Sequence, residues 1–154
     1  MEFNLITNKE EETIALGKKL GKLLNPGDLV LLKGDLGSGK TTLVKGIAEG
    51  LEVNPEIYIT SPTFSLINIY EGRHTLYHVD LYRLEIEDIE ELGIWEYLGS
   101  GVVVIEWAEK LPQIPKKDFI EIILEFIDYT RRKIIISGYG EWKELLKALE
   151  RDGL

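Results

Sequence analysis

The chain has 154 residues, 44% of them hydrophobic and 29% charged, and its formal net charge is −9. This length and composition predict one globular domain over residues 1–154. The chain contains no cysteine, which excludes disulfides, thiolate metal sites and cysteine nucleophiles. It shows neither an apolar run near the ~20 residues of a membrane span nor a secretory signal at its N-terminus. We therefore expect a cytoplasmic protein without a membrane partner.

The charge balance bears on the choice of macromolecular partner. Asp and Glu number 27, against 18 Lys and Arg. A protein that grips RNA or DNA by itself usually neutralises phosphates with a basic face. We expect no tight direct contact with nucleic acid, and binding to a basic protein is at least as compatible with this composition.

The N-terminal elements are a short strand near residues 3–5 and an amphipathic helix that ends at Asn25-Pro26-Gly27. Thr7 and Glu10 have capping-box spacing, so Thr7 is expected to cap this helix. The helix is mostly core scaffolding, although Thr13 is a candidate neighbour of a nucleotide base.

The next stretch carries the strongest motif. An apolar run at residues 29–32 predicts a strand, residues 43–48 have a helical pattern, and GDLGSGKT lies between them at residues 34–41. Strand, glycine-rich loop and helix in this order are the context of a phosphate-binding loop. Its glycines let backbone N–H groups surround an anion, and the helix N-terminus adds positive potential. The alternative is a glycine-rich turn that binds nothing.

Within this loop the residue types indicate separate roles. Lys40 is expected to reach the β- and γ-phosphates, and the Thr41 hydroxyl to ligate Mg²⁺. The residues expected to bind the nucleotide are Asp35, Leu36, Gly37, Ser38, Gly39, Lys40, Thr41 and Thr42.

The second half of the chain alternates strands, turns and helices. We expect a hairpin over residues 64–80, an acidic helical stretch at 85–98 interrupted at Gly93, and a buried strand at 101–106. A second hairpin over residues 119–137 turns at 128–130 and is followed by a final amphipathic helix. This order predicts an α/β fold, a three-layer P-loop NTPase-like sandwich whose central mixed, largely parallel sheet carries antiparallel hairpins.

Two carboxylates end apolar strands and are candidates for hydrolytic chemistry. Asp80 stands where a Walker-B acid would hold Mg²⁺, or it merely caps the following turn. Glu106 ends the most apolar strand, at the sheet edge where such folds bind ligands, and is either a water-orienting base or the first solvated residue. Trp107 either stacks on a base or packs in the core. His78 is expected to be a structural hydrogen-bonding group rather than a metal ligand.

The hydroxyl-rich segment of Thr60, Ser61, Pro62 and Thr63 lies between the loop's helix and the next strand. This is the place of switch I in GTPases, where a group senses the γ-phosphate. The other interpretation is a turn held extended before Pro62. Composition does not decide between them.

Taken together, these motifs resemble one family, TsaE (also called YjeE). GDLGSGKTT at residues 34–42, SPTF at 61–64, HVDLYRL at 78–84 and IEW at 105–107 follow its order and spacing. The resemblance covers essentially the whole chain, while the hairpin and the last residues match only in general character. Ser38 departs from the alanine that the family often has, and a small residue suffices there.

The resemblance implies a small P-loop ATPase that binds ATP or ADP with Mg²⁺ and hydrolyses ATP slowly alone. It implies work with the TsaD–TsaB pair, which forms threonylcarbamoyladenosine in tRNA, and contact with tRNA only through that complex. By position, Lys40, Asp80 and Glu106 would be catalytic, Thr41, Asp80 and Glu106 would hold the metal, and Trp107 would accompany Glu106 near the γ-phosphate. Residues 60–63 would form the switch-like loop.

Other activities stay open at this level. A small-molecule kinase needs a second substrate pocket and commonly an arginine-bearing lid. The chain has only five arginines, and Arg131 and Arg132 fall in the expected second hairpin turn. A nucleotide-gated binding module with incidental hydrolysis is a further alternative. A GTPase is disfavoured because no Asn-Lys-x-Asp motif is present.

Overall fold

The computed structural model describes residues 2–62 and 66–151. In this part of the chain a seven-stranded sheet has the order β1-β7-β6-β2-β5-β4-β3. The pairs among β6, β2, β5 and β4 are parallel, and the pairs β1–β7, β6–β7 and β3–β4 are antiparallel. The predicted α/β sandwich, with parallel strands in the middle and antiparallel hairpins beside them, is therefore confirmed.

The strands of this sheet are β1 (Glu2–Thr7), β2 (Leu29–Lys33), β3 (Ile67–Tyr70), β4 (Leu76–Asp80), β5 (Val102–Glu106), β6 (Phe119–Phe126) and β7 (Arg132–Tyr139). The helices are α1 (Glu10–Leu23), α2 (Lys40–Gly50), α3 (Ile86–Glu91) and α4 (Trp142–Arg151), with short 3₁₀ segments η1 (Ile94–Gly99) and η2 (Ala108–Lys110). The first hairpin was expected from residue 64; β3 begins at Ile67, and residues 64 and 65 lie outside the described residues.

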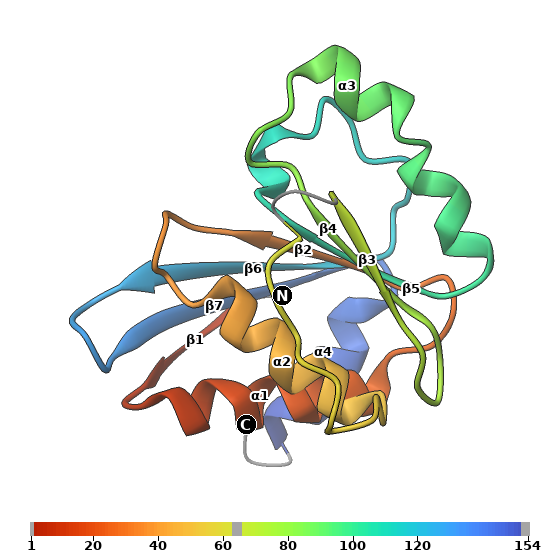
Figure 1. Ribbon diagram of the computed structural model, residues 1–154. Helices are drawn as coiled ribbons and strands as arrows, with labels where there is room; N and C mark the ends of the chain where they lie inside the picture. The colour runs from red at the N-terminus through yellow and green to blue at the C-terminus, as the bar shows by residue number, and fades with distance from the viewer. Residues whose placement is uncertain (1, 63–65, 152–154) are drawn as a thin grey trace.

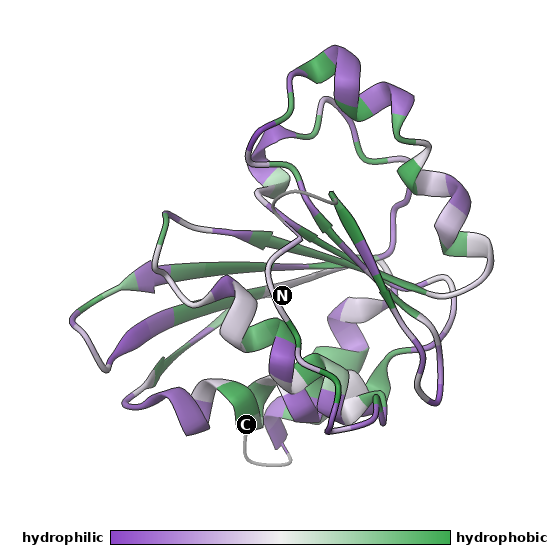
Figure 2. Ribbon diagram, viewed as in Figure 1, coloured by the Kyte–Doolittle hydropathy of each residue, from purple (hydrophilic) through white to green (hydrophobic). Residues whose placement is uncertain are grey.

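The sheet is the middle layer of three. Figure 1 shows α1, α2 and α4 against one face and α3 against the other. Every residue of β5 and nearly all of β2 are buried, and Figure 2 shows hydrophobic residues along these central strands. Because strands covered on both faces cannot alternate polar and apolar residues, β2 and β5 are continuous apolar runs in the sequence.

Close contact between α1 and α2 sets where the phosphate loop's helix lies. Four glycines face one another across this contact: Gly17, Gly21, Gly46 and Gly50. A Cβ added to Gly46 would lie 2.1 Å from the Ile14 carbonyl oxygen, which is far inside van der Waals contact. Glycine therefore lets the two backbones touch and holds α2 firmly beneath its N-terminal loop.

The expected capping box at Thr7 is wrong. Thr7 is still part of β1, where it pairs with Arg132, and its hydroxyl is 2.8 Å from that of Thr13. The helix begins at Glu10 after Lys9, which makes no side-chain cap hydrogen bond. Strand pairing kept Thr7 in extended backbone and gave its hydroxyl a buried partner, so the local capping pattern was overridden.

Candidate active site

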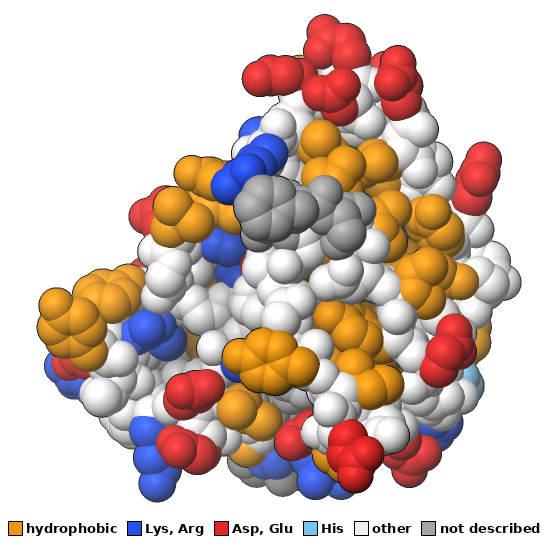
Figure 3. Space-filling model, in the orientation of Figure 1, with side chains coloured by type: hydrophobic (Ala, Val, Ile, Leu, Met, Phe, Trp, Pro, Cys, Tyr) orange, Lys and Arg blue, Asp and Glu red, His pale blue; other side chains and the backbone are white. Residues whose placement is uncertain are grey.

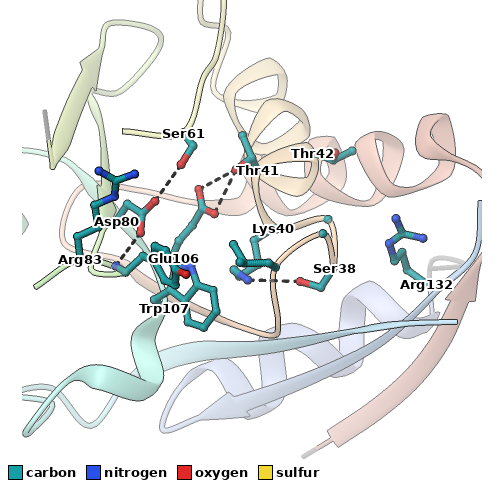
Figure 4. A pocket seen from close by; sticks show the side chains of 14 residues that line it. Ser38, Lys40, Thr41, Thr42, Ser61, Asp80, Arg83, Glu106, Trp107 and Arg132 are labelled. Carbon is teal, nitrogen blue, oxygen red and sulfur yellow. Dashed lines mark hydrogen bonds between the residues drawn. The ribbon is translucent and has the colours of Figure 1, made fainter. Parts of the chain in front are cut away.

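The carboxyl ends of β2, β4, β5 and β6 meet at one edge of the sheet, as parallel strands do. A cavity of about 510 Å³ opens there, and Figure 4 shows its side chains. Ligands bind at this edge in open α/β sheets. The residues that line it are Leu36, Gly37, Ser38, Gly39, Lys40, Thr41, Thr42, Ser61, Asp80, Tyr82, Arg83, Glu106, Trp107 and Arg132.

The glycine-rich loop forms one wall of this cavity. Gly37 and Gly39 have φ of +78° and +102°, a region that favours glycine, and Gly39 is the N-cap of α2. The helix has no side-chain cap at this end, so its first N–H groups are available to an anion. The loop thus has the backbone of a phosphate cradle, and the residues present fit a nucleotide phosphate.

Lys40 folds back onto this loop. Its buried ammonium donates to the carbonyl oxygen of Gly34 and to that of Asp35 at 3.0 Å. It also lies 4.2 Å from the centre of the Trp107 ring. Burial lowers the pKa of Lys40 from its ordinary value, and the nearby carboxylates, Glu106 foremost, only partly oppose this shift. A phosphate would give this poorly solvated cation an anionic partner, which binds it more strongly than two neutral carbonyls.

The side chains of Thr41 and Glu106 are hydrogen-bonded to each other. The Thr41 hydroxyl oxygen lies 3.1 Å from each carboxylate oxygen of Glu106, a residue that is 3% exposed. A hydroxyl has one proton to donate and keeps lone pairs for other partners. Thr41 can therefore donate to Glu106 and still present oxygen to a cation in the cavity.

Asp80 lies beside this pair, opposite Glu106 in the register of β4 and β5. One of its oxygens accepts from the Ser61 hydroxyl at 2.9 Å, and the other from the backbone N–H of Tyr82 at 2.9 Å. The two predicted acids are thus neighbours with different partners: Thr41 pairs with Glu106, and Asp80 pairs with Ser61.

These groups suit Mg²⁺ that arrives with phosphates. Hydroxyl and carboxylate oxygens are the ligands that Mg²⁺ prefers, and it is usually held by one or two carboxylates together with substrate phosphates. In the described ranges, no group of three or more His, Cys, Asp and Glu could hold a metal by itself. The oxygens of Thr41, Asp80 and Glu106 fit Mg²⁺ that is also bound by nucleotide phosphates.

The expected switch-like segment borders the cavity through Ser61. Thr60 is exposed, and its backbone carbonyl accepts from the Asn68 amide at 3.3 Å, while Pro62 is buried. Thr63 lies outside the described residues. The contact between Ser61 and Asp80 joins this segment to the strand end that carries the acid.

Trp107 is half-buried and has a φ of +61°, uncommon for a large side chain. Its ring lies over Lys40 and packs against Tyr82, with ring centres 4.8 Å apart. The strand-end tryptophan therefore contacts the phosphate-loop lysine in this structure, rather than packing only in the core.

Thr13 does not line the main cavity. It lies in a smaller adjoining hollow of about 100 Å³, shared with Gly39, Thr42, Tyr129 and Arg132. Thr42, Gly39 and Arg132 border both spaces, so the hollow continues the cavity along the N-terminus of α2. Its position next to the loop is compatible with a base or ribose subsite.

Arg132 is a site residue that the sequence pattern did not single out. The sequence places it where the turn of the second hairpin leads into a strand, and it is indeed the first residue of β7; what the sequence did not indicate is that it lines both spaces. Its Nη1 donates to the Asp128 carbonyl at 2.5 Å, and within the described residues its buried Nε has no hydrogen-bond partner. Figure 4 shows Arg132 and Arg83 at opposite ends of the cavity. The position of Arg132 depends on strand pairing, and no local motif indicated it.

A family model described as "Threonylcarbamoyl adenosine biosynthesis protein TsaE" matches residues 7–134, which is most of the chain. The chain belongs to the TsaE family. It is 44% identical over 137 residues to the tRNA threonylcarbamoyladenosine biosynthesis protein TsaE of Nostoc sp., a match that covers 85% of this chain and 83% of the relative. The TsaE protein of Bacillus subtilis is 39% identical over 142 residues, covering 91% and 88% of the two chains.

The fold agrees with this TsaE assignment. The crystal structure of Bacillus subtilis YdiB superposes with a TM-score of 0.80 at 33% identity, covering 100% of this chain and 97% of the other. Membership in TsaE supports a role in tRNA threonylcarbamoyladenosine biosynthesis. In residues 2–62 and 66–151 no helix is long and apolar enough to cross a membrane.

Proposed function

We propose that this TsaE-family chain is a cytoplasmic P-loop ATPase that binds Mg-ATP and hydrolyses it slowly. The observation that carries the proposal is the meeting of Lys40, Thr41, Asp80 and Glu106 in one cavity at the carboxyl edge of the sheet. The first two belong to the phosphate loop, and the two acids come from neighbouring parallel strands. A phosphate cradle that only bound nucleotide would not need two acids at its mouth.

Each side chain has a role that follows from its position. The loop N–H groups and Lys40 bind the β- and γ-phosphates, and Arg132 adds positive charge from the far wall. Thr41 and Glu106, with Asp80 beside them, hold Mg²⁺, which supplies charge neutralisation on the phosphate oxygens. Glu106 also orients water at the γ-phosphate, and Ser61 of the switch-like segment bonds to Asp80.

The client of this cycle is the TsaD–TsaB pair in threonylcarbamoyladenosine formation. The names of the relatives place them in that biosynthesis. A formal net charge of −9 disfavours direct tRNA binding, and Figure 3 shows acidic side chains gathered over α3. We propose that tRNA is contacted by the partner proteins and that hydrolysis here supports their repeated turnover.

Steady-state ATP hydrolysis tests this proposal, measured with the chain alone and after addition of TsaD and TsaB. We expect slow turnover alone and at least a severalfold increase with both partners. Lys40→Ala is expected to abolish nucleotide binding, because it removes the cation that the loop holds at its centre. Lys45→Ala, five residues further along α2 and outside the cavity lining, is the matched control.

Two results would overturn the proposal. Unchanged nucleotide affinity in Lys40→Ala would remove the loop from the binding site. No stimulation by TsaD and TsaB, together with phosphorylation of a small acceptor, would instead identify a kinase.

A further inference from the structure

His78 stands behind the active site and has no assigned role in the proposed reaction. Its side chain is fully buried, and it comes from β4, two residues before Asp80 on the same face of the strand. Its Nε2 atom is in hydrogen-bond contact with Oε2 of Glu106. Glu106 is therefore hydrogen-bonded to side chains of two other elements, His78 of β4 and Thr41 of α2.

When Glu106 is ionised its carboxylate only accepts, so Nε2 carries the hydrogen of this contact, whether the imidazole is neutral or protonated. Within the described residues Nδ1 makes no hydrogen bond, so the hydrogen bond of the ring is the one between Nε2 and Glu106. A buried carboxylate needs donors to offset lost hydration, and here they are one hydroxyl and one ring N–H.

We propose that His78 is a positioning residue that fixes the Glu106 carboxylate for the chemistry at the γ-phosphate, an inference that rests on the proposed function. Without His78, the rotamer of Glu106 would depend on the Thr41 hydroxyl alone. That hydroxyl is also a proposed ligand of Mg²⁺. The imidazole is rigid and clamped in the strand, so it fixes the second carboxylate oxygen independently of the ligand. An error of about 1 Å in a reacting group costs on the order of a hundredfold in rate.

Two substitutions separate donation from packing. His78→Gln keeps an N–H donor at the reach of Nε2, and His78→Leu fills similar space without one. We expect His78→Leu to lower kcat by about tenfold to a hundredfold, with the Kd for ADP measured without Mg²⁺ unchanged within about twofold. His78→Gln is expected to retain kcat within about threefold. Val79→Ala, on the opposite face of the same strand, controls for loss of core packing.

A second readout does not depend on hydrolysis. The chain has two histidines, and His74 is only partly buried. In NMR spectra of the nucleotide-free protein, we expect a slowly exchanging Nε2 proton for His78. It should vanish in His78→Leu, shift in Glu106→Gln and stay unchanged in Val79→Ala.

The outcomes divide cleanly. A folded His78→Leu that hydrolyses ATP at the wild-type rate overturns the inference, and so does a His78→Gln as slow as His78→Leu. A His78 resonance that does not respond to Glu106→Gln also overturns it. If the wild-type chain binds no nucleotide, the proposed function fails, and the NMR result still decides whether His78 holds Glu106.

Discussion

At the scale of single residues, Glu106 is the acid of the candidate site that side chains from two other elements contact. Glu106 is the last residue of β5, and its carboxylate is hydrogen-bonded to Thr41 of α2 and to His78 of β4. Three elements therefore converge on one carboxylate that is almost completely buried. These hydrogen bonds hold the carboxylate in one orientation at the cavity, as positioning of a reacting group requires.

Replacing Glu106 by Gln tests that interpretation. Glutamine keeps the size and one carbonyl acceptor but removes the charge, so it should preserve nucleotide binding and impair turnover. We expect kcat to fall by about a hundredfold, with the Kd for ATP in the absence of Mg²⁺ within about threefold of wild type. Isothermal titration and steady-state hydrolysis measure the two quantities.

Asp35→Asn, which removes a loop carboxylate close to Lys40, is the companion variant and should retain turnover much better. A Glu106→Gln protein that loses affinity and turnover equally would show that the carboxylate supports ligand binding in general, and would contradict a role confined to the reaction.

At the scale of elements, the turn between β6 and β7 determines where Arg132 lies. Asp128 accepts from the backbone N–H of Arg131 at 2.8 Å and from its side chain at 2.8 Å, and its own carbonyl accepts from Arg132. This network closes the hairpin at the edge of the cavity. It therefore couples a surface turn to an arginine of the site.

The Asp128 carboxyl gives this turn a measurable pH dependence. Hydrogen bonds from the Arg131 side chain and backbone lower the pKa of Asp128 from 3.8 to about 2. Because the folded pKa is the lower one, the turn's stabilisation is present above about pH 4 and is lost as the pH falls towards 2. An NMR titration should report this pKa, and Arg131→Gln should move it back towards 3.8. An unmoved pKa of Asp128 would show that the Arg131 side chain is not the cause of the shift.

At the scale of the whole molecule, ligand binding should stabilise the fold. The cavity joins the N-terminus of α2 to the ends of β4 and β5, so a nucleotide would link elements far apart in sequence. A ligand that binds only the folded state contributes ~2.7 kcal/mol at a hundredfold excess over Kd. For a protein of this size that amounts to a rise in Tm of about 5–10 °C.

Thermal unfolding with Mg-ADP measures this effect. We expect the full rise with Mg-ADP and a smaller rise when EDTA removes the metal, because Thr41 and Glu106 then lose their ionic partner. Lys40→Ala should show little rise under either condition. An equal rise with and without EDTA would contradict the assignment of Thr41 and Glu106 to the metal.

The sequence by itself determined the phosphate loop, the α/β class and the two acids at strand ends. The loop lies within residues 34–41, and its backbone conformation depends on glycines only two or three positions apart, at 34, 37 and 39. The buried central strands can also be predicted from the sequence, because burial on both faces requires a run of apolar residues. The family resemblance also needed only the order and spacing of short motifs.

The tertiary structure alone decided which of these groups touch. Thr41 and Glu106 are 65 positions apart, and His78 and Glu106 are 28 apart, so their contacts follow from strand order and register. The same pairing places Arg132 at the edge of the cavity and keeps Thr7 in β1, where it does not cap the helix as expected. Local patterns are set by neighbouring residues, whereas these contacts are set by packing between distant segments, which no short stretch of sequence encodes.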